Sequence, residues 1–423
     1  CLIQANSNKQ EHIKMSDSTP LHDLLTEMVQ AYSQKNQPPH IPTPAEIGTH
    51  LHPLLDRMCA EAESRNASDI FISAGFPPAM KVSGVLSPVP HKALTGEETA
   101  AIVESTMNPE QLEAFNQNWE INYSVQSRSN TRYRVNAYHE QGRVGMVLRR
   151  INQKIPEIDE LGLPPKLKDL ALTPRGMLIL AGPTGSGKST TMASMLDYRN
   201  NKVPGHIVTI EDPIEYIYKP RRCIFTQREV GIDTPDWKIA VQSAMRQAPD
   251  VVCIGEVRSE SSMEYAMQLA QTGHLCVFTI HANNAAQAIE RITNFYSEDR
   301  RPQVLMDLAL NLTGIIGQRL VIRKNRTLRT AVIDLLLNTP AMQDLIFKGD
   351  LMDVHGLMQR SSTEGMQTFD QHLFNLYIKD QIEYDEALRQ ADSVNDLRLR
   401  IQMHEEGNDP ARLYDRISDL NLM

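Results

Sequence analysis

The sequence predicts an α/β protein with a small α+β domain, a larger domain built on a mostly parallel sheet, and a helical C-terminal region. Length is the first observation, because 423 residues suffice for two to four domains at roughly 100–200 residues each. Short alternating apolar segments after residue 51 are the second, and they indicate a mixed domain. The third is the alternation of apolar strands with helical segments from about residue 172, typical of a parallel sheet covered by helices.

Composition excludes several classes of protein. Hydrophobic residues make up 41% and charged residues 22%, which fits neither a disordered nor a fibrous chain. The net charge of −9 offers no broad basic surface, so nucleic acid is not an expected partner. Five cysteines without a CxxC pair indicate neither a disulfide framework nor a cysteine zinc site, and favour a reducing cytoplasm. No apolar run is long enough for a spanning helix, and no signal peptide is recognisable.

Residues 1–50 are polar and proline-containing, and we expect a flexible N-terminal extension. An amphipathic stretch at 21–29 resembles another at 51–59, either as a duplicated docking helix or, as we prefer, by chance. The chain begins with Cys1, which would fit a processed lipoprotein. We favour Met15 as the initiator, because it follows a polar stretch without a pattern.

The remaining elements follow in order along the chain. The first domain, 51–152, begins with a helix and continues with alternating segments at 70–72, 79–82, 133–137 and 145–148. A proline-interrupted linker is expected at 153–171. The second domain, 172–346, carries apolar strands at 177–180, 206–210, 251–254 and 275–279, and a helical region follows at 347–423.

A glycine-rich segment between an apolar strand and a helical run matches the pattern Gly-x-x-x-x-Gly-Lys-Ser/Thr, with Gly182, Gly187, Lys188 and Ser189. The glycines let backbone N–H groups point at phosphate oxygens, the lysine reaches the β- and γ-phosphates, and the serine holds Mg²⁺. A chance glycine-rich turn is disfavoured by the flanking elements. The predicted ATP-binding residues are Gly182, Pro183, Thr184, Gly185, Ser186, Gly187, Lys188, Ser189 and Thr190.

Carboxylates follow two of the predicted strands. Glu211 and Glu215 follow the strand at 206–210, and Glu256 closes the segment 250–256, just after the strand at 251–254. In an open α/β fold, ligands bind at this edge of the sheet. Solvated loop charges are the alternative, which two such clusters in one phosphate-binding domain disfavour.

Two histidines, His274 and His281, flank the apolar strand at 275–279. An imidazole near the γ-phosphate could sense hydrolysis, but a histidine in such a place is as often a hydrogen-bonded structural residue. Spacing leaves both interpretations open.

Together the segments GPTGSGKST, TIEDPIEY, APDVVCIGEVRS and TGHLCVFTIHANN resemble the Walker A, Asp box, Walker B and His box of the secretion ATPase superfamily. Further segments, among them NASDIFISAGFPP, GQRL at 317–320 and LLNTP, resemble the pilus retraction ATPases of the PilT/PilU type over residues 51–401. TQREVG, IGEVRS, HANN and GMQTFDQ are more similar to the PilU branch of that family.

This resemblance implies a PAS-like N-terminal domain, a RecA-like P-loop motor domain and a hexameric ring at the cytoplasmic side of the inner membrane. ATP would lie between the two domains. Lys188 and Ser189 would bind phosphate and Mg²⁺, with Glu211 and Glu256 as further metal ligands. Glu215 is the candidate general base, and His274 and His281 match the His box.

The resemblance also implies that arginines of the N-terminal domain reach the γ-phosphate and stabilise transition-state charge. Arg134, Arg143 and Arg149 lie in the matching stretch, and we select Arg134 and Arg149, each with a solvated strand-edge charge as the alternative. Arg258 and Arg291 are weaker candidates for subunit contacts.

The function implied is an ATP-hydrolysing motor that powers or assists pilus retraction, at the base of the pilus, with a PilT-type ATPase and an inner-membrane platform protein as partners. One alternative is an accessory ring-binding subunit with little ATPase of its own. A pilus-assembly or type II secretion ATPase is disfavoured, because such proteins usually carry a four-cysteine zinc site and a longer N-terminal region. Three features depart from the family: the segment 15–50, the extension 402–423, and Ser259 in place of the usual Asp of PilT.

Overall fold

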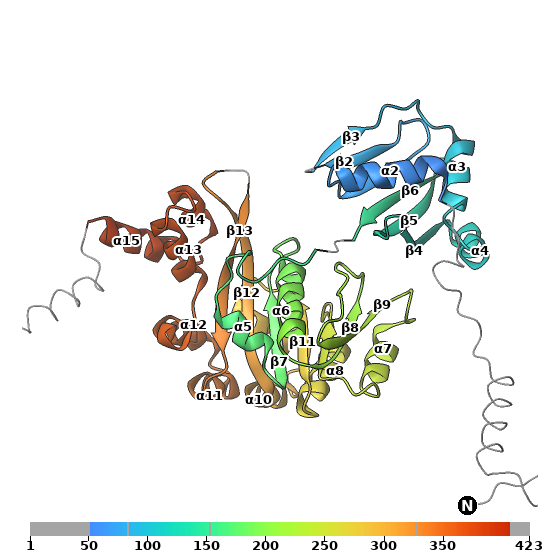
Figure 1. Ribbon diagram of the computed structural model, residues 1–423. Helices are drawn as coiled ribbons and strands as arrows, with labels where there is room; N and C mark the ends of the chain where they lie inside the picture. The colour runs from blue at the N-terminus through green and yellow to red at the C-terminus, as the bar shows by residue number, and fades with distance from the viewer. Residues whose placement is uncertain (1–50, 83, 152–153, 326–327, 407–423) are drawn as a thin grey trace, which may run out of the picture.

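The computed structural model describes residues 51–82, 84–151, 154–325 and 328–406 (Figure 1). Expectations for residues 1–50 and for 407–423 lie outside these ranges. Within them, the α/β fold class predicted above is confirmed, with an α+β N-terminal domain, a second domain built on a mostly parallel sheet, called the ATPase domain after the resemblance above, and a helical C-terminal region.

The N-terminal domain is a six-stranded antiparallel sheet in the order β3-β2-β1-β6-β5-β4. Its strands are β1 (Asp69–Ile72), β2 (Ala79–Val82), β3 (Val85–Pro88), β4 (Glu120–Gln126), β5 (Arg132–Glu140) and β6 (Arg143–Arg150). Its helices are α2 (Pro53–Ser64), α3 (Gly96–Glu104) and α4 (Pro109–Asn118). Alternation along β5 buries Tyr133, Val135 and Ala137 on one face, while Arg132, Arg134 and Asn136 lie on the other face.

The ATPase domain has a seven-stranded sheet in the order β13-β12-β7-β11-β10-β8-β9, parallel except for β13. The strands are β7 (Gly176–Ala181), β8 (Gly205–Glu211), β9 (Cys223–Glu229), β10 (Val251–Ile254), β11 (Leu275–Ile280), β12 (Leu312–Ile322) and β13 (Arg329–Leu337). All residues of β7, β10 and β11 are buried, which explains their continuous apolar sequence. Because the strands are parallel, their carboxyl ends form one edge of the sheet.

Helices cover this sheet and extend beyond it. They are α5 (Lys166–Ala171), α6 (Lys188–Lys202), α7 (Trp237–Ala244), α8 (Glu260–Gln271), α9 (Ala285–Thr293), α10 (Arg301–Asn311), α11 (Pro340–Lys348) and α12 (Leu351–Arg360). A short 3-10 helix, Ser362–Glu364, leads to α13 (Phe369–Ile378), α14 (Tyr384–Gln390) and α15 (Val394–Glu405). These last three helices share a small apolar cluster with Val321 and Val332, separate from the main core. No helix among the described residues is long and apolar enough to cross a bilayer.

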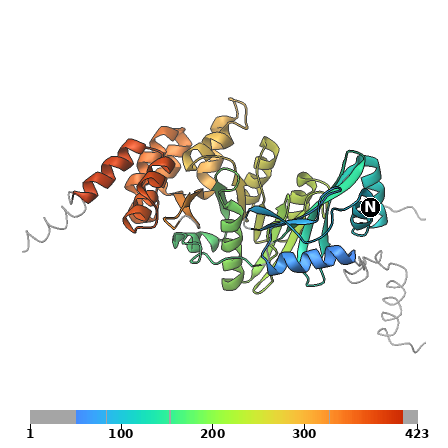
Figure 2. The ribbon, with the colours of Figure 1, turned by 90° about the horizontal axis from the view of Figure 1, so that it is seen from above.

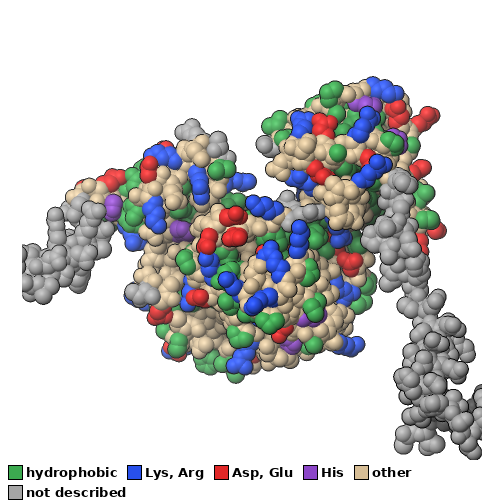
Figure 3. All heavy atoms as spheres, viewed as in Figure 1, with side chains coloured by type: hydrophobic (Ala, Val, Ile, Leu, Met, Phe, Trp, Pro, Cys, Tyr) green, Lys and Arg blue, Asp and Glu red, His purple; other side chains and the backbone are tan. Residues whose placement is uncertain are grey.

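The N-terminal domain and the C-terminal helices lie at opposite ends of the ATPase sheet (Figures 1 and 2). The N-terminal domain is over the β8–β9 end, where the Arg132 guanidinium lies 4.0 Å from the Glu229 carboxylate. The C-terminal helices are at the β12–β13 end. A hollow separates the two parts on the face shown in Figure 3.

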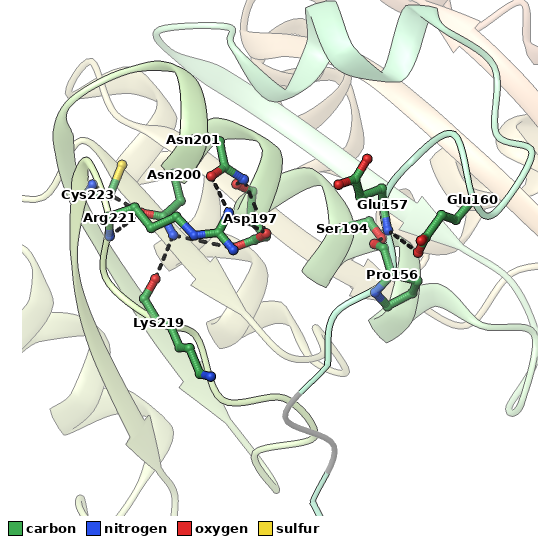
Figure 4. Close-up of polar contacts among 10 residues, drawn as sticks. All are labelled: Pro156, Glu157, Glu160, Ser194, Asp197, Asn200, Asn201, Lys219, Arg221 and Cys223. Atoms are coloured by element: carbon green, nitrogen blue, oxygen red, sulfur yellow. Dashed lines mark hydrogen bonds and ion pairs between the residues drawn. The ribbon is translucent and has the colours of Figure 1, made fainter.

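The segment expected as a linker contacts the ATPase domain along much of its length. Ile158 and Leu163 are buried in the main core. The Ser194 hydroxyl of α6 donates a hydrogen bond to the Pro156 carbonyl, and the Glu157 N–H donates to the Glu160 carboxylate at 3.1 Å (Figure 4). From about Ile155 onward, the chain is therefore part of the ATPase domain.

Helix α6 also positions the start of β9 (Figure 4). The Asn200 side chain is fully buried. Its Nδ2 donates to the Lys219 carbonyl at 2.9 Å, and its Oδ1 accepts from the N–H groups of Arg221 and Cys223 at 3.0 and 3.1 Å. One side chain thus satisfies three backbone groups of the segment that precedes β9.

Candidate functional site

The predicted phosphate-binding loop, called the phosphate loop below, connects β7, which ends at Ala181, to α6, which begins at Lys188. Gly185 and Gly187 adopt φ values of +77° and +86°, which favour glycine because other residues are strained there. A side chain at Gly187 would also meet Gln318 Nε2, 2.8 Å from an ideal Cβ. Backbone shape therefore favours glycine at both positions, and close packing also disfavours a side chain at Gly187.

Lys188 lies inside this loop and is 8% exposed. Its ammonium donates hydrogen bonds to the carbonyls of Gly182 and Pro183, at 2.8 and 2.9 Å. Burial lowers the pKa of the Lys188 ammonium, while the negative charges of Glu256 and Glu215 raise it. The phosphate loop and both predicted carboxylate clusters are thus close enough to interact electrostatically.

Sequence reasoning missed Gln318, which braces the phosphate loop from β12. Gln318 is 2% exposed; its Nε2 donates to the Ser186 carbonyl at 2.8 Å, and its Oε1 accepts from the Thr191 hydroxyl at 2.7 Å. The available signal was the segment 317–320, which the sequence analysis used only as part of the resemblance. The buried Ser186 Oγ has no hydrogen-bond partner among the described residues, which fits an atom that awaits a ligand.

Glu211 and Glu215 differ in environment although they belong to one cluster. Glu211, at the end of β8, is buried, and its Oε1 accepts hydrogen bonds from Thr209 Oγ1 at 2.6 Å and Gln227 Nε2 at 3.3 Å. Burial raises the pKa of the Glu211 carboxyl to about 7. Glu215 is exposed on the following loop, whose Tyr216 hydroxyl lies 2.9 Å from Thr190 Oγ1 of α6. Glu215 is therefore the more accessible of the two.

Glu256 and His281 face each other at the carboxyl edge of the sheet. His281 Nε2 lies 2.8 Å from Glu256 Oε1, and the Arg258 guanidinium lies 2.6 Å from Glu256 Oε2. The contact with His281 has poor hydrogen-bond geometry, and Oε1 is a buried acceptor without a partner of good geometry. The Glu256 side chain is 16% exposed and that of His281 is 38% exposed, so both remain accessible at the surface of the site.

The structure does not bring His274 to this edge. Its carbonyl accepts from the Gly176 N–H at 3.0 Å, at the start of β7, and its ring Nδ1 lies 3.0 Å from the Thr272 hydroxyl. The six residues of β11 separate it from His281, a span of about 20 Å. Within this chain, His274 caps the opposite edge of the sheet.

The predicted arginines of the N-terminal domain lie opposite each other on β5 and β6. Arg149 donates to the Asp69 carboxylate at 2.8 Å, and Arg134 lies near Glu229, whose carboxyl pKa is raised by burial while Arg132 and Arg134 act to lower it. Neither makes a hydrogen bond or ion pair with residues 181–190 in the described chain. Arg143 packs against Gly96 within the N-terminal domain.

A cavity of about 590 Å³ lies between the phosphate loop and α9. Its lining includes Pro183 and Thr184 of the loop, His281, and Arg291 of α9. A second cavity, of about 410 Å³, lies between α7 and α8 and reaches Glu256 and Arg258. The carboxyl edge is thus hollowed on both sides of the Glu256–His281 pair.

The donor set fits a Mg²⁺ ion bound together with phosphate. Mg²⁺ is usually held by one or two protein oxygens plus phosphates and waters rather than by a protein cage. Ser189 in the first turn of α6 and Glu256 supply such oxygens; Glu256 Oε1 makes no hydrogen bond of good geometry, although His281 Nε2 lies 2.8 Å from it. Glu211 fits less well, because its Oε1 already accepts two hydrogen bonds.

Comparison with known proteins gives consistent matches. The family described as "Type II/IV secretion system protein" matches residues 46–373. The chain is 51% identical to the type IV pilus ATPase PilU of Pseudomonas aeruginosa over 81% of this chain and 90% of that protein. It is 35% identical to the retraction ATPase PilT of the same organism, over 80% of this chain and 98% of that protein.

Among solved structures, the crystal structure of the pilus retraction motor PilT with bound ADP superimposes with a TM-score of 0.77. The two sequences are 36% identical, and the match covers 81% of this chain and 98% of that one. The similarity therefore includes both the N-terminal and the ATPase domain.

Proposed function

We propose that this chain, which belongs to the type II/IV secretion system protein family and within it to the type IV pilus ATPases of the PilT/PilU type, hydrolyses ATP to power or assist pilus retraction. One observation carries the mechanism: the loop that holds Lys188 shares one sheet edge with the Glu256–His281 pair and with Glu215. A phosphate acceptor, a metal ligand and a candidate base are therefore available around one nucleotide.

In this proposal Lys188 exchanges the carbonyls of Gly182 and Pro183 for phosphate oxygens when a nucleotide binds. Ser189 and Glu256 would hold Mg²⁺, and the bound ion would supply charge neutralisation at the phosphates. Glu215 orients and deprotonates the attacking water, and it is the better candidate than Glu211 because it is exposed. His281 responds to the state of the γ-phosphate through Glu256.

Positive charge for the transition state comes from the N-terminal domain. Arg134 and Arg149 are the candidates, and each would have to leave its present surroundings as the domains close. Closure in one subunit would strain its neighbour, so we extend the proposal to a closed ring of six copies. The ring would act at the pilus base, on the cytoplasmic side, through a membrane platform protein and beside a PilT-type ATPase.

A second candidate function is an accessory subunit that hydrolyses little ATP alone. The observation that favours it is the ion pair between Arg258 and Glu256, since the metal-binding carboxylate is neutralised by its own loop. A partner subunit that withdraws Arg258 would then activate the site.

The experiment that decides is steady-state ATPase activity of the purified chain, alone and after addition of a PilT-type protein. Lys188→Ala serves as the blank, because its fold should be intact while its phosphate binding is lost. Activity of the chain alone supports the motor, and activity confined to the mixture supports the accessory subunit. If Lys188→Ala matches the wild type in both conditions, the assigned site is wrong.

A further inference from the structure

The loop that carries His281, residues 281–284, is held at its far end by residues outside the nucleotide site. The Arg319 guanidinium donates to the Asn283 carbonyl at 3.2 Å, and Asn284 Nδ2 donates to the Asp392 carboxylate at 3.4 Å. The next N–H, that of Ala285, donates to the buried Asp334 carboxylate at 2.7 Å. Three consecutive residues are thus each fixed by one polar contact.

Arg319 is itself anchored by the C-terminal helices. Its guanidinium lies 2.6 Å from Asp392 Oδ1, donates to the Gln390 carbonyl at 2.7 Å, and lies 4.1 Å from the centre of the Phe369 ring. The side chains of Arg319 and Asp392 are only 18% and 22% exposed, so this ion pair is less screened than one at the surface.

Asp392 is in turn fixed to the body of the C-terminal region. The Asp370 carboxylate in the first turn of α13 accepts hydrogen bonds from the N–H groups of Asp392 and Ser393, at 2.8 and 2.9 Å. Asp370 is 8% exposed. The apolar cluster of α13–α15 is separate from the main core, although it includes Val321 of β12 and Val332 of β13, and a displacement of these helices against the two valines would carry Asp392 with it.

Two neighbouring residues of β12, Gln318 and Arg319, make their contacts with two different loops. Gln318 points to one side of the strand and braces the phosphate loop, whereas Arg319 points to the other side and contacts the 281–284 loop. Loss of the Arg319–Asp392 pair should therefore disturb His281 without disturbing the phosphate loop.

We propose that Arg319 is a positioning residue that clamps the 281–284 loop to the C-terminal helices, so that a shift of these helices changes how His281 faces Glu256. The inference rests on the ATPase function proposed above. It assigns a regulatory role to the C-terminal region, because a partner that displaces α13–α15 would alter hydrolysis more than nucleotide binding.

The test compares Asp392→Ala with Lys324→Ala. Lys324 makes an ion pair of 2.5 Å with Asp380, also between the β12 end and the C-terminal region, but it does not contact the 281–284 loop. We expect Asp392→Ala to lower kcat by about tenfold with KM for ATP nearly unchanged, and Lys324→Ala to change neither. Equal effects of the two variants on kcat and KM would mean that Asp392 has only a structural role, and would overturn the proposal.

Hydrogen exchange gives a readout that does not depend on turnover. In the full-length protein, peptides that cover 281–288 should exchange faster in Asp392→Ala than in the wild type, while peptides that cover 181–190 should not. Unchanged exchange at 281–288 would overturn the clamp even if activity falls. A wild-type protein without ATPase activity, alone or mixed, would instead overturn the proposed function, and the exchange result would still decide the clamp.

Discussion

At the residue scale, Gln318 is the side chain on which the shape of the phosphate loop depends most directly. Gln318→Ala would leave the Ser186 carbonyl and the Thr191 hydroxyl buried without their partner. The loss of such buried hydrogen bonds costs about 1–3 kcal/mol. We therefore expect nucleotide affinity to fall by about tenfold, measured by titration with a fluorescent ADP analogue. Gln303→Ala, on the exposed surface of α10, is the matched control and should bind normally.

The two accessible carboxylates of the site allow a sharper test of roles. Glu215→Gln and Glu256→Gln each keep the shape of the side chain and remove its charge. Glu215→Gln should bind ATP and Mg²⁺ normally and lose at least about 100-fold in turnover, because a base is removed. Glu256→Gln should additionally require more Mg²⁺ for half-maximal activity, measured by Mg²⁺ titration. Wild-type turnover in either variant would remove that residue from the site.

Asp334 supplies a prediction about pH. Burial raises the pKa of its carboxyl to about 7; Asp392 and Asp370 also raise it, whereas Arg319 and the Ala285 N–H lower it. Since the folded protein holds this proton more tightly than the unfolded chain, the stability that Asp334 contributes is full below about pH 4 and is lost as the pH rises through about 7.

The comparison that isolates this effect is Asp334→Asn, which keeps an acceptor for the Ala285 N–H. From pH 4 to 7, the free energy of unfolding of the wild type should fall relative to that of Asp334→Asn, by about 1–4 kcal/mol. Denaturant titrations at several pH values measure it. A difference that stays constant with pH would mean that Asp334 is ionised throughout.

At the scale of elements, the start of β9 depends on the end of α6. Asn200→Ala would leave three backbone groups of residues 219–223 without their partner, and we expect a loss of about 2–4 kcal/mol in the free energy of unfolding. The neighbouring Asn201 is exposed, so Asn201→Ala should cost less than about 0.5 kcal/mol. Urea denaturation of the two variants tests this, and similar midpoints would refute the role of Asn200.

The sequence predicts best those strands that are buried on both faces. Strands β7, β10 and β11 are apolar on both faces, so a continuous apolar run reveals them. Strand β9 contains Thr226, Gln227 and Arg228, and its polar side chains serve contacts that are distant in sequence, such as Gln227 with the Tyr216 carbonyl. Local periodicity carries no information about such contacts.

The same limit applies to the site. His274 and His281 flank one strand symmetrically in the sequence, and only the parallel register of β11 with β7 decides which of them lies beside the phosphate loop. The glycine pattern predicts the loop itself because the constraint is local. Gln318 and Arg319 come from a strand that pairs with β7 from more than 130 residues away, so no local pattern assigns them to the site.

At the scale of the whole molecule, the proposed ring predicts a change in mass. The proposed mechanism takes its positive charge from arginines of the N-terminal domain, which make no pair with the phosphate loop in the described chain, and it therefore requires domain closure. Light scattering with a non-hydrolysable ATP analogue should therefore detect a closed oligomer of about six copies, with more oligomer than without it. A strictly monomeric protein that has full ATPase activity would refute the ring.

The short connection between the N-terminal domain and the ATPase domain also limits how two copies of the chain can exchange domains. Ile151 is buried in the N-terminal domain and Ile155 already packs on the ATPase domain, and four residues can span at most about 14 Å. Domain swapping with an adjacent copy would have to fit within the same reach. A mixed assembly with a related ATPase would accordingly form by exchange of whole subunits, each of which contributes its own N-terminal domain and its own ATPase domain.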